Sequence, residues 1–127
     1  ATARMSVPMV WVVLRRGYGL GAQAMLAGST REPVLTVAWP GAHMGPMGLE
    51  GAVRLAMGKE LDALPPAERD LRVRELTAQY REHVDALNVA RVFEVDDVID
   101  PALTRATIAS VLAAPPTVPS ERPVDTW

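Results

Sequence analysis

The chain has 127 residues, 49% of them hydrophobic, with no cysteine and a formal net charge of -2 at pH 7. The length fits one globular domain, and the absence of thiols excludes disulfides, thiolate nucleophiles and thiolate-bound metals. The slightly acidic charge provides no basic field for a polyphosphate backbone, so we expect no nucleic-acid partner.

The first feature along the chain is an apolar stretch from Val7 to Leu14, followed by two arginines. The stretch is far shorter than the roughly 20 residues that a membrane span needs, and no small-residue cleavage site of a secretory signal follows it. Its high valine content predicts a strand buried on both faces, as in a layered α/β core. We therefore expect a cytoplasmic protein without a membrane segment.

A glycine-rich turn, Gly17 to Gly21, separates this strand from a short helix that we expect from Leu20 to Ala27, ended by Gly28. Such a turn presents unpaired backbone amides in one direction and can hold an anion or an oxyanion, with the amides of Leu20 and Gly21 as donors. The same residues also suit a tight strand-to-helix turn that binds nothing. Gly19, Gly21 and Ala24 match a dinucleotide-binding fingerprint in part, but no acidic ribose-binding residue closes a second strand, which argues against a dinucleotide site.

The order of strand, glycine loop and helix then occurs again. Residues 34–39 predict a second strand, residues 42–48 a loop rich in methionine and glycine, and residues 49–61 an amphipathic helix. Pro65 and Pro66 interrupt the chain before a charged helix expected over residues 67–87. Apolar residues recur in it at spacings of three and four, which predicts a face in the core or in a subunit contact. These residues are Val73, Leu76, Tyr80, Val84 and Leu87.

Residues 93–99 predict a short strand or extended turn, and Asp100 with Pro101 provides the N-cap and first turn of a final helix that ends near Ala113. The segment after this helix is rich in proline and has little apolar pattern. We therefore expect one domain over residues 1–113 and an irregular tail over residues 114–127.

Few side chains are candidates for a metal site or a catalytic group that could replace the site formed by backbone amides. His43 and His83 have no second ligand at metal spacing, so the sequence predicts no metal site. Ser29 lacks the sequence context of a hydrolase nucleophile. Asp96 and Asp97 are adjacent, and neighbours in an extended chain point to opposite sides, so we expect turn or cap roles for them.

Sequence blocks in a fixed order carry a family resemblance. They are VVLRRGYGLGAQAM over residues 12–25, VAWP over 37–40, MGLEGAV over 47–53 and VDDVIDP over 95–101. Together they resemble the biotin-dependent acyl-CoA carboxyltransferases, the carboxyltransferase subunits of acetyl- and propionyl-CoA carboxylases. The resemblance implies an α/β, crotonase-like spiral of ββα units, of which this chain would be the later portion of the second half.

The resemblance also implies a site. The backbone amides of Leu20 and Gly21 would form an oxyanion hole for the ureido oxygen of biotin, and Gly19, Ala22 and Gln23 would contact the substrate. Many family members have an aspartate, associated with acyl-chain choice, where this chain has Gln23, which leaves the acyl length open. The enolate oxyanion hole belongs to the first half of the family's domain, so we expect catalysis to need that complementary half.

The implied function is transfer of a carboxyl group from carboxybiotin to an acyl-CoA in fatty acid metabolism. The implied partners are a biotin carboxyl carrier protein, a biotin carboxylase and further carboxyltransferase copies or halves in a homo- or hetero-oligomer. Two alternatives remain open at this point. One is a biotin-linked acyl-CoA decarboxylase subunit, and the other is a noncatalytic crotonase-like assembly module.

Overall fold

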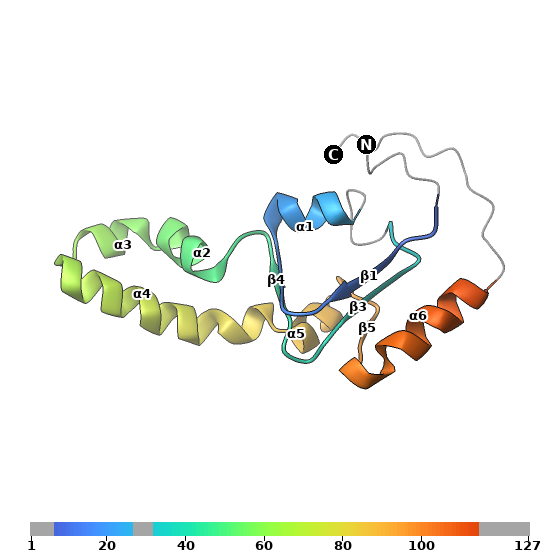
Figure 1. The fold of residues 1–127 in the computed structure, drawn as a ribbon. Helices are drawn as coiled ribbons and strands as arrows, with labels where there is room; N and C mark the ends of the chain where they lie inside the picture. Colours follow the sequence, from blue (N-terminus) through green and yellow to red (C-terminus); the bar gives the residue numbers. More distant parts are fainter. Residues whose placement is uncertain (1–6, 27–31, 115–127) are drawn as a thin grey trace.

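The structure is a computed structural model that describes residues 7–26 and 32–114. Two successive ββα units form its first part (Figure 1). The first unit contains β1 (Val10–Val13), β2 (Arg16–Tyr18) and α1 (Gly19–Met25). The second contains β3 (Leu35–Ala38), β4 (His43–Gly45) and α2 (Leu49–Ala56). The ββα order that the family resemblance implies is therefore present.

The two units stack in parallel register. Strand β1 pairs with β3, with Val10 opposite Leu35, and β2 pairs with β4, with Arg16 opposite His43. A short fifth strand, β5 (Asp97–Val98), adds to the other side of β3, which gives one sheet in the order β1-β3-β5 and a second of β2 and β4. Parallel pairing requires the long crossovers that the helices supply.

The structure corrects the predicted strands in three places. The first strand is shorter than residues 7–14, since β1 ends at Val13 and Leu14 is exposed. Gly17 and Tyr18, expected in a turn, belong to β2, and the expected loop over residues 42–48 contains β4. The pairing of β2 with β4 outweighs the low strand propensity of glycine in these segments.

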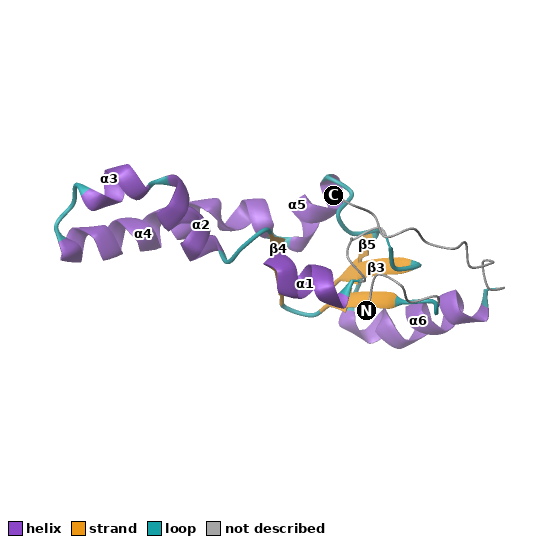
Figure 2. Cartoon of the chain, turned by 90° about the horizontal axis from the view of Figure 1, so that it is seen from above, coloured by secondary structure: helices purple, strands orange, loops and turns teal. Residues whose placement is uncertain are grey.

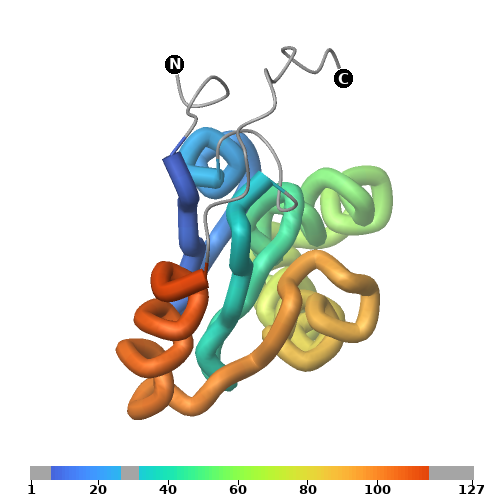
Figure 3. The backbone as a smooth tube through the Cα atoms, turned by 90° about the vertical axis from the view of Figure 1, so that its right-hand side faces the viewer, coloured from blue at the N-terminus to red at the C-terminus, as the bar shows by residue number. Residues whose placement is uncertain are grey.

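The main core lies between the sheet and helix α5 (Ala86–Arg91), and it contains Val13, Ala38, Ala42, Met44, Ala86, Val89 and Val95. Figures 2 and 3 show α1 and α5 on one side of the three-stranded sheet and α6 (Thr104–Ala113) on the other. Helix α6 follows the short helix η3 (Pro101–Leu103), and Asp100 caps that turn by accepting a hydrogen bond from the Ala102 amide at 2.8 Å. The predicted cap at Asp100 is confirmed.

Helices α2, α3 (Gly58–Asp62) and α4 (Pro66–Tyr80) form an arm that extends away from the sheets (Figure 1). The arm has its own small core, made of Val53, Leu61, Val73 and Leu76 with Met57 against it. Ion pairs between its helices add to this packing, namely Arg54 with Asp70 at 3.4 Å and Arg72 with Glu60 at 3.2 Å. The single helix expected over residues 49–61 is divided at Met57, before Gly58.

The charged helix predicted over residues 67–87 is also divided. Helix α4 ends at Tyr80, a 3-10 turn η2 (Arg81–Val84) follows, and Asp85 is extended before α5 begins. The side chain of Asp85 accepts the Asn88 amide at 2.8 Å, so the aspartate acts as the N-cap of a new helix. Of the predicted apolar face, Val73 and Leu76 are buried in a core, whereas Tyr80 and Leu87 are exposed, so for these two only the subunit-contact alternative stays open.

No helix among the described residues combines the length and apolar character that crossing a membrane requires. Gly28 and residues 115–127 lie outside the described residues, so the expected end of the first helix at Gly28 and the irregular tail stay predictions.

Candidate functional site

The site predicted from the glycine-rich turn lies where β2 passes into α1. Gly19 has a φ of +60°, the left-handed conformation that glycine adopts far more readily than other residues. A Cβ atom on Gly19 would lie 3.0 Å from the backbone carbonyl oxygen of Pro46, in the loop after β4. Both the torsion and this close approach require glycine. The β4–α2 loop therefore fixes the direction in which α1 begins.

The first turn of α1 leaves its amides available to a ligand. Tyr18, the N-cap, is extended and makes no side-chain capping bond, and the first turn contains no acidic residue. Amides in the first turn of a helix have no intrahelical acceptor. Leu20 is 81% exposed and Gly21 is also exposed, with no atom within 4 Å of a Cβ placed on it. The two amides that the sequence singled out thus lie at an open, uncapped helix start.

A pocket of about 390 Å³ opens beside this turn. Its wall includes Gly19, Leu20, Ala22 and Gln23 from the predicted site, together with Pro46. Gly21 is not in the wall and lies exposed next to these residues in the chain. The carbonyls of Ala22 and Gln23 both accept the Leu26 amide at 3.1 Å, which closes the C-terminal end of α1. All five predicted residues are therefore at one place.

Other wall residues could not be found from the turn itself. Trp11 comes from β1, Met44 from β4, and Val89 and Glu94 from the end of α5 and the residues after it. Trp11 also packs against Gly17, where a Cβ would lie 3.1 Å from the indole ring. No local sequence signal connects these residues with the turn, because the fold alone brings them together. Most of the wall is apolar, as is usual for a pocket that takes a small organic group.

The other candidate side chains have structural roles. The Asp96 carboxylate accepts the amide of Thr36 in β3 at 2.7 Å, which is a contact between distant segments and not the expected local turn or cap. The Asp97 carboxylate accepts the amide of the next residue, Val98, at 2.7 Å. His43 pairs with Asp85 through an isolated backbone bridge, and the ring of His83 lies 5.7 Å from that of Tyr80. Among the described residues no group of histidines and carboxylates could hold a metal ion, and Ser29 lies outside them.

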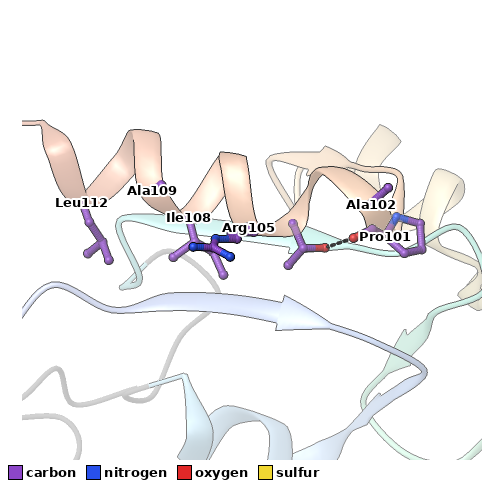
Figure 4. A pocket seen from close by; sticks show the side chains of 7 residues that line it. Pro101, Ala102, Arg105, Ile108, Ala109 and Leu112 are labelled. Atoms are coloured by element: carbon purple, nitrogen blue, oxygen red, sulfur yellow. Dashed lines mark hydrogen bonds between the residues drawn. The ribbon is translucent and has the colours of Figure 1, made fainter.

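Two further hollows lie away from the turn. One is an apolar groove along α6, where Figure 4 shows Ile108 and Leu112 on the same side of the helix as Arg105. The other lies on the arm beside Arg54, whose pKa is raised by hydrogen bonds from its guanidinium to Glu50 and then Asp70. Neither hollow includes any of the residues predicted from the glycine-rich turn.

Comparison with known proteins identifies the family of the chain. Residues 1–125 match the carboxyl transferase domain. The chain belongs to the carboxyl transferase family. Over 126 residues it is 36% identical to the methylmalonyl-CoA carboxyltransferase 12S subunit of Propionibacterium freudenreichii subsp. shermanii, a match covering 97% of this chain and 23% of that subunit. Over 117 residues it is 32% identical to the beta6 subunit of a biotin-dependent acetyl-/propionyl-coenzyme A carboxylase of Mycobacterium bovis, covering 91% of this chain and 24% of that subunit.

Solved carboxyltransferases share the architecture. A single-chain, multi-domain long-chain acyl-CoA carboxylase superposes with a TM-score of 0.76 at 49% identity, covering 87% of this chain and 10% of that one. The transcarboxylase 12S hexamer superposes with a TM-score of 0.72 at 36% identity, covering 87% of this chain and 21% of that one. The ββα units thus belong to the crotonase-like fold of this family, as the resemblance implied. This carboxyl transferase chain spans about a quarter or less of the relatives described here.

Proposed function

We propose that this chain is the biotin-binding portion of a biotin-dependent acyl-CoA carboxyltransferase. One observation carries the proposal. Within a chain of the carboxyl transferase family, a left-handed Gly19 begins a helix whose first turn has neither a side-chain cap nor an acidic residue, at the edge of a largely apolar pocket. This arrangement suits a ligand that combines a strong hydrogen-bond acceptor with an apolar ring.

Carboxybiotin is such a ligand. When it is present on its carrier, it supplies an activated carboxyl group. As that group leaves, negative charge develops on the ureido oxygen, and donors aimed at this oxygen stabilise the transition state more than the ground state. The amides of Leu20 and Gly21 would be these donors, and the partial positive charge of the helix start would add to their effect. No side-chain nucleophile is needed from this chain.

The acyl-CoA and the enolate oxyanion hole would come from the complementary half of the carboxyltransferase domain. Gln23 and Ala22 would then border the acyl group beside the biotin ring. Gln23 is neutral, and most of the pocket wall around it is apolar, including Trp11 and Met44. An acyl chain longer than acetyl is therefore the substrate that we favour. The similarity to a long-chain acyl-CoA carboxylase supports this choice.

The partners in this proposal are a biotin carboxyl carrier protein, a biotin carboxylase and the complementary carboxyltransferase half, in an oligomer. The similarity to the 12S hexamer supports an oligomer. A decarboxylase subunit would use the same amides in the reverse direction, and a relative of that kind in Propionigenium modestum is 32% identical over 109 residues. Carboxylation of biotin by a carboxylated acyl-CoA, with release of the decarboxylated acyl-CoA and without ATP, would identify that direction.

The test of the site removes one amide. Gly21→Pro deletes a donor in the first turn of α1, where a proline is tolerated because that amide has no intrahelical partner. The matched control is Gly51→Pro, since Gly51 is likewise the third residue of its helix, α2, and likewise has no neighbouring atom within 4 Å of an added Cβ. Binding of biocytin, a soluble biotin amide, to the full chain is measured by NMR titration of backbone amides.

In the unaltered chain we expect biocytin to shift the Leu20 and Gly21 amide signals. Gly21→Pro should weaken binding by about five- to tenfold, because a hydrogen bond to a neutral acceptor contributes about 1 kcal/mol. Gly51→Pro should leave the affinity unchanged. Equal affinities in all three proteins, or shifts confined to other parts of the chain, would show that α1 is not the biotin site.

A further inference from the structure

Glu94 is the one ionisable side chain among the described residues that line the pocket beside α1. It shares this wall with Leu20, one of the two proposed amide donors, and with Gln23. The wall therefore combines a residue whose backbone amide is a proposed donor with a residue that carries a carboxylate. Such a combination of donor and acceptor is specific for ligands that carry both an acceptor and an N–H group.

The backbone around Glu94 is held by a strained residue. Phe93 has a φ of +61° and is the one described residue other than glycine with a positive φ. Its amide donates to the Ala90 carbonyl at 3.0 Å, and the Glu94 amide donates to the Val89 carbonyl at 3.2 Å. These are the two bonds of the Schellman turn that ends a helix, in which the left-handed position is usually glycine.

Packing of the Phe93 side chain does not offset this strain, because Phe93 is 84% exposed. A left-handed conformation is unfavourable for a residue with a Cβ atom, and such strain tends to persist at functional sites. The turn reverses the direction of the chain directly after α5. It places Glu94 in the pocket wall together with Val89, the residue to which the Glu94 amide is bonded.

A cyclic urea matches this arrangement. Its oxygen accepts hydrogen bonds, and each unsubstituted ring nitrogen carries an N–H donor. The α1 amides donate to the oxygen, and a carboxylate, which offers about four acceptor positions, can accept from an N–H while keeping its other contacts. A nitrogen that carries a carboxyl group has no N–H and brings a like charge toward Glu94, which is unfavourable.

Building on the proposed biotin site, we infer that Glu94 is a substrate-binding residue that accepts a hydrogen bond from the N–H of the uncarboxylated ring nitrogen of biotin. The carboxyl group is then turned away from Glu94 and toward the acceptor substrate. Glu94 thus selects which nitrogen of the ring faces the reacting acyl group, while the amides of α1 hold the oxygen.

The test compares two small probes, 2-imidazolidinone and its 1,3-dimethyl derivative, which has the same urea oxygen and no N–H. Dissociation constants for the full chain are measured from the Leu20 and Gly21 amide signals in three proteins: unaltered, Glu94→Ala and Glu82→Ala. Glu82 is the control, because it is also an exposed glutamate and is not in the pocket wall. Each substitution removes one negative charge, so a general charge effect would be equal in the two variants.

We expect the unaltered chain and Glu82→Ala to bind 2-imidazolidinone roughly three- to tenfold more tightly than the dimethyl probe, as for a hydrogen bond to a charged group near solvent. In Glu94→Ala the preference should vanish. If the Leu20 and Gly21 signals respond to both probes and the preference is the same in all three proteins, the role of Glu94 is disproved and the α1 site stands. If neither probe moves those signals in the unaltered chain, both the α1 site and the Glu94 assignment fall.

Discussion

At the scale of single residues, Gly19 determines the shape of the site. Replacing it with alanine forces a Cβ atom into the left-handed region and to within 3.0 Å of the Pro46 carbonyl oxygen. We expect Gly19→Ala to lower the free energy of unfolding by about 1–3 kcal/mol, since the torsion alone costs about 1–2 kcal/mol. Urea denaturation followed by tryptophan fluorescence measures this change.

Gly51→Ala is the matched control for that substitution. Gly51 lies inside α2, its φ is not positive, and no atom lies within 4 Å of an added Cβ. Alanine should therefore raise the free energy of unfolding by about 0.5–1 kcal/mol through its higher helix propensity. The same glycine-to-alanine substitution then lowers the free energy of unfolding at position 19 and raises it at position 51. Equal effects would mean that Gly19 is not held in the left-handed conformation.

The residues of the site were predictable only where they are consecutive. Leu20 and Gly21 could be named from the glycine turn, and Gly19, Ala22 and Gln23 from the family resemblance, and the structure places the five residues together. Trp11 and Glu94 could not be named, because they reach the pocket from other elements and nothing in their own neighbourhood indicates a site. The left-handed Phe93 was equally hidden, since an exposed phenylalanine is an unusual choice for that conformation.

At the scale of elements, the arm of α2, α3 and α4 depends on a small core of its own. Leu76, which is 2% exposed, is one of four buried residues in it, whereas Leu71 on the same helix is 52% exposed. Leu76→Ala should lower the free energy of unfolding by about 2–4 kcal/mol, because it leaves a cavity that few neighbours can fill. Leu71→Ala should change it by less than about 1 kcal/mol.

Hydrogen exchange locates the effect of Leu76→Ala. The arm core shares no residue with the main core, so the amides of α2 and α4 should lose protection while those of β1 and β3 keep it. A uniform loss of protection over the whole chain would instead mean that arm and sheets unfold as one unit. In that case the arm would not be an independent element of the fold.

Elements marked by an apolar run or by a cap were easier to predict than strands that contain glycine. The strand around residues 35–38 and the helix from Thr104 to Ala113 follow from valine-rich or capped stretches, and the structure contains both. Strands β2 and β4 have three residues each and include glycine, so only their pairing with each other defines them. The division at Asp85 was missed because an aspartate in a charged segment suits a helix surface as well as a cap.

At the scale of the whole molecule, the fold was predictable from the family resemblance and not from composition. Length and hydrophobic content indicate only one globular domain, whereas the ordered blocks around residues 12–25 and 95–101 indicate the crotonase-like spiral. The structure and the comparisons confirm that fold. The assignment of the chain to the second half of the carboxyltransferase domain remains a prediction. Testing it requires the residues that bind the acyl-CoA.

The edge strand β1 and the exposed apolar side of α6 indicate contact with another chain. Among the described strands β1 is an edge strand, which pairs with β3 alone, and α6 contains no buried residue. Leu112 on α6 is 59% exposed beside the apolar groove of that helix. Apolar surface of this kind on a folded chain usually contacts another protein surface.

We therefore expect the chain to be recovered from its native source in a complex and not as a free 13.7 kDa monomer. Native mass spectrometry of the protein isolated under gentle conditions measures the mass of the complex, and dissociation in the instrument identifies its components. A complex that contains the complementary crotonase-like half and a biotinylated carrier supports a carboxyltransferase. Recovery of the free monomer alone would contradict the proposed assembly.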